Sequence, residues 1–98
     1  MFEIEFANDG IVAVDGRLDA AQAVKAQAFL DQVEGQCVID LAKLEYISSA
    51  GLGVLLKTHK RIMGSGSGIK LINVNHHIHD IFRYSGFDKL FEIVPANN

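Results

Sequence analysis

The sequence lacks several features that would place it in a specialised class of protein. Its 98 residues include a single cysteine, Cys37, so no intramolecular disulfide can form, which fits a reducing compartment. No apolar run approaches the roughly 20 residues that a membrane-spanning helix needs. The first ten residues, MFEIEFANDG, have neither the cationic start nor the apolar segment of a signal peptide. We therefore expect a cytoplasmic protein that does not associate with a membrane.

Positive charge is also scarce. Nine Lys and Arg residues stand against twelve Asp and Glu residues, which gives a net charge of −3. Acids and bases are spread along the chain, so no basic surface is expected that would attract a phosphate backbone, and we expect no nucleic acid as a partner. Apolar residues make up 49% of the chain, which argues against disorder. The length fits one folded domain over residues 1–98.

Five short segments have the composition of β-strands. Phe2, Ile4 and Phe6 alternate with glutamates, the pattern of a strand with one solvated face. The turn residues Asn8-Asp9-Gly10 separate this segment from IVAVDG, so the two predict an antiparallel hairpin. Three further apolar runs, CVIDL, IKLINV and EIV, predict strands later in the chain.

Apolar residues at three- and four-residue spacing predict three helices between these strands. The first follows Asp19, with Gln22 placed to complete a capping box, and ends at Gly35. The second extends from about Ser49 to Met63. The side chains expected to face the core in these two helices are Ala26, Phe29, Leu30 and Val33, then Leu52, Leu55, Leu56, His59, Ile62 and Met63. Cationic residues Lys57, Lys60 and Arg61 are expected on the outer face of the second helix.

The third helix is expected to begin after Asn75 and to end at Gly86, with Ile78, Ile81 and Phe82 facing inward. The element order is therefore β-β-α-β-α-β-α-β. Alternation of strands and helices predicts an α/β domain whose mixed sheet has parallel pairs and one N-terminal antiparallel hairpin.

The segment YISSAGLGVLL contains two adjacent serines that are candidates for a functional site. Ser48 and Ser49 would follow the carboxyl end of a strand and begin a helix, the place where open α/β sheets bind ligands. One serine could simply cap the helix, and a phosphoserine there would meet free N–H groups without disrupting the helix. A hydrolase nucleophile requires glycine two residues earlier, but Tyr46 and Ile47 occupy those positions. We expect no catalytic residue in this chain.

Other segments offer weaker candidates for a functional site. The run GSGSG ends a helix rather than opening one, so it predicts a connector and not a phosphate-binding loop. His76 and His79 would share a helix face, but no further ligands are evident, so we expect neither a metal nor a cofactor. Tyr84 and Phe87 are expected in the core or at the helix end. Asp19 is expected to cap the first helix.

The stretch DLAKLEYISSAGLGVLL, residues 40–56, resembles the signature of STAS domains, in particular of bacterial anti-sigma factor antagonists. The resemblance covers nearly the whole chain, because the opening hairpin, the GRLD entry to the first helix and the late segment IHDIFRYSGFDKLFEI also fit. It implies a STAS domain that acts by binding a partner and not by catalysis.

In that family, an anti-sigma factor that is itself a serine kinase phosphorylates a serine that corresponds to Ser49. The unphosphorylated antagonist binds the anti-sigma factor and frees sigma, and a PP2C-type phosphatase restores it. Ser48 stands where an acid is common and Ala50 where a serine is common, so Ser48 remains an alternative acceptor. The resemblance implies a partner-binding surface that consists of Arg17, Asp19, Ser48, Ser49, Ala50, Gly51 and Leu52.

Two alternatives remain open from the sequence. The chain could be a STAS subunit that regulates another complex, in lipid transport or stress signalling, without reversible phosphorylation. It could also be a small ligand-binding or enzymatic domain that uses the helix start as an anion site.

Overall fold

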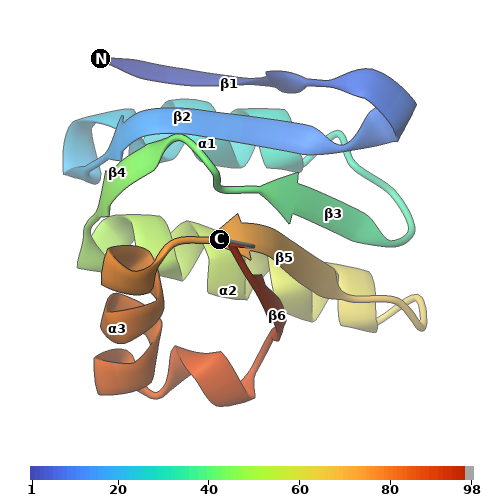
Figure 1. Ribbon diagram of the computed structural model, residues 1–98. Coiled ribbons are helices and arrows are strands. Elements are labelled where there is room, and N and C mark those ends of the chain that lie inside the picture. The colour runs from blue at the N-terminus through green and yellow to red at the C-terminus, as the bar shows by residue number, and fades with distance from the viewer. Residues whose placement is uncertain (97–98) are drawn as a thin grey trace.

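The computed structural model describes residues 1–96 and shows one α/β domain with a mixed sheet and helices packed against it (Figure 1). Within these residues there are six strands and three α-helices. Their bounds are β1 (Phe2–Phe6), β2 (Val12–Leu18), α1 (Ala23–Leu30), β3 (Cys37–Asp40), β4 (Leu44–Ile47), α2 (Ser49–Met63), β5 (Ile69–Val74), α3 (His76–Ser85) and β6 (Glu92–Pro95). The predicted fold class and order are confirmed, except that β4 was not predicted.

The strands lie in the order β1-β2-β3-β5-β6, with β4 also paired to β2. β1 is antiparallel to β2, as predicted, and the remaining pairs are parallel. Gly16 of β2 lies opposite Phe2 and has a φ of +88°. A Cβ at this position would overlap the carbonyl oxygen of Met1, so only glycine allows the hairpin to close in this register.

Strand β2 pairs along one edge with two successive strands. Val12 and Ala13 pair with β3, and the segment from Gly16 to Leu18 pairs with β4. The chain bends between β3 and β4 because an Asp40 carboxylate oxygen accepts hydrogen bonds from Ala42 N at 2.9 Å and Asn73 Nδ2 at 3.1 Å. No strand was predicted between CVIDL and the second helix, and the structure corrects this by placing β4 there. Strand β4 was not predicted because it has only four residues and a register shift interrupts the alternation of its buried and exposed side chains.

Helices α1 and α2 lie together behind the sheet in Figure 1. The expected inward residues are confirmed for Leu52, Leu55 and Ile62, but Met63 is 55% exposed. The buried side of α2 also includes Val54 and the fully buried Thr58, so the face of this helix that meets the sheet is rotated from the predicted one. The hydroxyl of Thr58 accepts a hydrogen bond from the Gln27 side chain of α1 at 3.1 Å.

Helix α3 begins and ends as predicted. The Asn75 side chain accepts a hydrogen bond from Ile78 N at 2.9 Å, and Gly86 ends the helix in the left-handed conformation, with φ +79°. Tyr84 lies in the last turn of α3, as one of the two expected alternatives had it, but it is 84% exposed and does not belong to the core. Phe87 is half-buried and packs edge-on to Phe91, with ring centroids 6.2 Å apart.

Candidate functional site

The two serines lie at the junction between β4 and α2, and their roles differ. The Ser48 hydroxyl accepts a hydrogen bond from Gly51 N at 3.2 Å, and Ser48 N donates to the carbonyl oxygen of Leu18 at 2.9 Å. Ser48 is half-buried and has the extended backbone of a helix N-cap, with φ −87° and ψ 173°. One hydroxyl is therefore used to satisfy a backbone donor that the first turn of α2 leaves free.

Ser49 is the first residue of α2, and its side chain is exposed. The positive end of the helix dipole and the free N–H groups of the first turn favour a negative group at this position. A phosphate on Ser49 could therefore form without breaking the cap at Ser48. The Ser48 hydroxyl therefore has a structural role, whereas Ser49 is accessible to solvent.

The next residues hold the start of α2 against the sheet. A Cβ at Gly51 would lie 2.8 Å from Ile47 Cγ1, 2.8 Å from Leu18 Cγ and 2.9 Å from the Leu18 carbonyl oxygen. Gly51 and Leu52 are both buried, so they position the helix start and do not themselves present a surface. Ala50 and Gly53 are exposed beside Ser49, and a Cβ at Gly53 would meet nothing within 4 Å.

Arg17 and Asp19 flank the end of β2, next to the end of β4. In the register of these strands Arg17 lies opposite Tyr46, and its guanidinium group is 4.4 Å from the centre of the Tyr46 ring. An Asp19 carboxylate oxygen accepts a hydrogen bond from Gln22 N at 3.2 Å. The predicted capping role of Asp19 is confirmed, although a turn of 3-10 helix precedes α1. The contact between Arg17 and Tyr46 was not predicted from the sequence, because the two residues are far apart in the chain.

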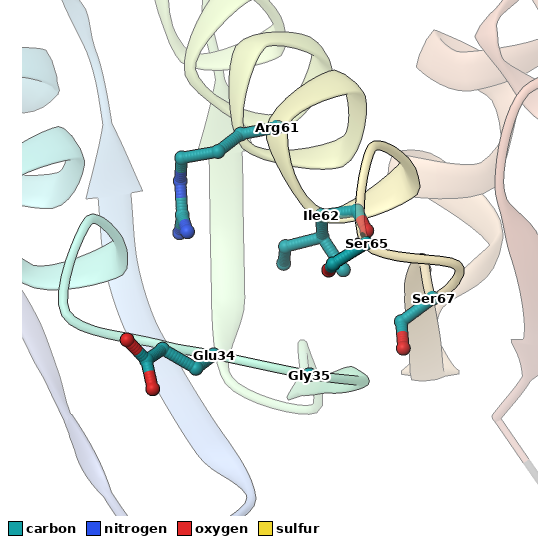
Figure 2. Close-up of a pocket in the computed structure, with 6 residues that line it drawn as sticks. All are labelled: Glu34, Gly35, Arg61, Ile62, Ser65 and Ser67. Carbon is teal, nitrogen blue, oxygen red and sulfur yellow. Dashed lines mark hydrogen bonds between the residues drawn. The ribbon is translucent and has the colours of Figure 1, made fainter.

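A cavity of about 450 Å³ lies at the other end of α2, lined by Glu34, Gly35, Arg61, Ile62, Ser65 and Ser67 (Figure 2). One nitrogen of Arg61, Nη2, donates to the carbonyl oxygens of Leu30 and Val33, both at 2.9 Å. Arg61 thus binds carbonyl groups at and just beyond the end of α1, where a cation complements the helix dipole. The sequence placed Arg61 only on an outer face and missed this contact.

The remaining candidates are accounted for by local contacts. His76 Nε2 lies 3.5 Å from an Asp80 carboxylate oxygen, and within residues 1–96 no three His, Cys, Asp or Glu side chains are placed to hold a metal ion. Cys37 is 1% exposed, and burial raises the pKa of its thiol from 9.0 to about 11, with the charge of Arg61 opposing the shift. None of the helices formed by residues 1–96 is long and apolar enough to cross a membrane.

The fold and the sequence together identify the family. The family described as "Mlab, STAS domain" matches residues 4–95, nearly the whole chain. This chain therefore belongs to the STAS domain family.

Within that family the chain is similar to anti-sigma factor antagonists. It is 33% identical over 90 residues to BtrV of Bordetella bronchiseptica, which is described as an anti-sigma factor antagonist; the match covers 88% of this chain and 78% of BtrV. The crystal structure of an anti-sigma factor antagonist from Mycobacterium paratuberculosis matches with a TM-score of 0.80 and 26% identity, over 97% of this chain and 85% of that one. The phosphorylated form of SpoIIAA from Bacillus shares the fold, with a TM-score of 0.68 and 17% identity, over 96% of this chain and 91% of that one.

Proposed function

We propose that this protein is an anti-sigma factor antagonist that binds an anti-sigma factor while Ser49 is unmodified and thereby frees a sigma factor. The observation that carries the proposal is the exposed hydroxyl of Ser49 at the start of α2, separate from the hydroxyl of Ser48 that caps the helix. The similarity to BtrV supports the same role. The proposal places the protein in the cytoplasm and assigns it no catalytic step of its own.

The proposed switch is phosphorylation of Ser49 by the anti-sigma factor acting as a serine kinase, reversed by a PP2C-type phosphatase. A phosphate adds a charge of about −1.5 to −2. If the first turn of α2 is part of the contact, desolvating this charge without a cationic partner costs several kcal/mol, enough to weaken binding by orders of magnitude. Ser49 is favoured over Ser48 as the acceptor because the Ser48 hydroxyl is half-buried and already bonded to Gly51 N.

The contact surface that we propose consists of the exposed residues at this junction. Arg17, Ser49 and Ala50 are exposed, and Asp19 and Ser48 are half-buried beside them. Gly51 and Leu52 contribute indirectly, since they are buried and fix the position of the helix start.

A capture experiment with four baits tests the switch. Wild type, Ser49→Ala, Ser49→Asp and Ser67→Asp are used on host lysate, and bound proteins are identified by mass spectrometry. Ser67 lies beyond the far end of α2, so Ser67→Asp adds the same charge away from the site. We expect an anti-sigma factor on every bait except Ser49→Asp. Equal capture of the anti-sigma factor by Ser49→Asp would refute the phosphorylation switch.

Reconstitution identifies the acceptor. The purified anti-sigma factor is incubated with ATP, Mg²⁺ and wild type, Ser48→Ala or Ser49→Ala. We expect phosphate on Ser49 in wild type and in Ser48→Ala, and none in Ser49→Ala. Phosphate on Ser48 of the wild-type protein would show that the acceptor is misassigned.

A second candidate is a regulatory STAS subunit of another assembly. The matching family is described by the name Mlab and not as an antagonist, and this description favours the second candidate. In that case the captured partner would be no anti-sigma factor, and all four baits would retain it equally.

A further inference from the structure

Charge is distributed unevenly along the exposed face of α2. The sequence of this helix, SAGLGVLLKTHKRIM, contains no aspartate or glutamate. Its outer residues at three- and four-residue spacing form what we call the α2 stripe, which consists of the exposed residues Ser49, Ala50, Gly53, Lys57 and Lys60. Neither lysine forms an ion pair with another residue among 1–96. The stripe is therefore small and uncharged at its first half and cationic at its second half.

The face of the sheet away from the buried side chains has the opposite character. Because side chains alternate along strands, the residues between the buried positions of β2, β3 and β5 point to this face, as do the residues of β1 and β6 that pair with them. Its carboxylates are Glu3, Glu5, Asp15, Asp40 and Glu92, and its cations are Lys70 and, at the end of β2, Arg17. Glu3 lies directly opposite Asp15, an arrangement that destabilises a sheet, whereas Glu92 has a cation, Lys70 Nζ, at 3.7 Å.

From this distribution we infer that Lys57 and Lys60 extend the binding surface along α2 and that the anti-sigma factor presents carboxylates to them. The inference rests on the proposed function and goes further, because it names the chemistry of the partner surface. A partner with an acidic patch would be attracted to the α2 stripe and repelled by the carboxylates of the open face of the sheet, which lie away from the end of β2 where Arg17 is. The field of the molecule thus selects one docking face.

The same chemistry explains how one phosphate could act on a wider surface. At about 1.5 Å of rise per residue, Ser49 lies about 12 Å from Lys57 and about 16 Å from Lys60 along the helix axis. A partner that places carboxylates over the lysines would bring part of its negative field close to Ser49. A phosphate on Ser49 would then be repelled by the partner's carboxylates, in addition to losing its hydration in the contact.

The small residues of the stripe have a complementary role. Ala50 and Gly53 leave the backbone of α2 uncovered near Ser49, so a partner can approach this end of the helix closely. Close packing occurs at this end, and long-range attraction comes from the lysines. We therefore expect the lysines to affect mainly the rate of association.

The test compares two variants of equal net charge. Lys57→Glu with Lys60→Glu reverses the stripe, and Lys43→Glu with Lys89→Glu reverses two exposed lysines outside α2. Association and dissociation rates with the purified anti-sigma factor are measured by biolayer interferometry at low and high ionic strength. Steering of this kind changes association rates by about 10-fold to 1000-fold, and the Debye length falls from about 10 Å at 0.1 M salt to about 3 Å at 1 M.

We expect association of the stripe variant to slow by about 10-fold or more at low salt, with most of the difference lost at high salt. The control variant should associate no more than about twofold more slowly than wild type, because it changes charges outside the stripe. Equal slowing of both variants, or no slowing of the stripe variant, would overturn the inference while leaving the proposed function intact. Failure of wild type itself to bind any anti-sigma factor would overturn both.

Discussion

Alanine substitutions at the two glycines in the first turns of α2, Gly51 and Gly53, are expected to change the free energy of unfolding in opposite directions. At Gly53, a new methyl group meets nothing within 4 Å, so the substitution should only improve helix propensity. The expected gain is about 0.5 to 1 kcal/mol in the free energy of unfolding. At Gly51, the methyl group would lie within 3.0 Å of Ile47, of the Leu18 side chain and of the Leu18 carbonyl oxygen.

The clash at Gly51 is not easily relieved. Side chains of Leu18 and Ile47 could rotate, but the Leu18 carbonyl oxygen is held at 2.9 Å from Ser48 N. Overpacking of this kind costs about 1 to 3 kcal/mol. Taking the upper end and subtracting the gain of about 1 kcal/mol in helix propensity leaves Gly51→Ala less stable by about 2 kcal/mol.

Urea unfolding followed by circular dichroism measures both variants under identical conditions. The predicted difference between Gly51→Ala and Gly53→Ala is about 3 kcal/mol, from the same substitution two positions apart. If Gly51→Ala were as stable as Gly53→Ala, the close approach of α2 to β2 would not limit the residue at position 51. The reasoning that makes Gly51 a packing residue would then fail.

Three further predictions concern stability. Ser48→Ala removes the N-cap of α2 and should lower the free energy of unfolding by about 1 kcal/mol, which corresponds to a fall of roughly 4 to 8 °C in Tm. Ser49→Ala should stay within about 0.5 kcal/mol of wild type. Equal losses of stability in the two variants would contradict the separate roles of the two serines. Arg61→Ala leaves the carbonyl oxygens of Leu30 and Val33 without their donor and should lower the free energy of unfolding by about 1 to 3 kcal/mol, and a Tm unchanged from wild type would contradict this. The pKa of Cys37 is raised from 9.0 to about 11, so the unfolded chain loses its thiol proton first and stability should fall as pH rises from 9 to 11. Cys37→Ala should lack this component of the pH dependence in chemical denaturation, and parallel curves for the two proteins would refute it.

The sequence predicted much of the fold because local signals agreed with the final packing. The cap at Asn75 and the stop at Gly86 bound α3 as expected, and alternation in β1 identified a strand with a solvated side. Strand β4 was missed in the sequence analysis because it is short, contains a register shift and forms only by pairing with β2. Local pattern carries no information on such a partner.

The limits at the site are of the same kind. The sequence located Ser48 and Ser49 at a helix start, but it could not decide which hydroxyl is the cap, since that depends on the backbone angles at the end of β4. The Arg17–Tyr46 contact and the bonds from Arg61 to α1 join residues far apart in the chain. Met63 was misplaced because its spacing fits a buried face while the packing of α2 leaves it 55% exposed.

The division between Ser48 and Ser49 also bears on how long a phosphorylated form of the protein would survive in a cell. Degradation of a small domain often follows the population of its unfolded form, which depends on the free energy of unfolding. Because the structural hydroxyl belongs to Ser48, a phosphate on Ser49 would leave the cap in place. The helix dipole also favours a negative group at the start of α2, so the phosphorylated form should be at least as stable as the unmodified form and should be degraded no faster.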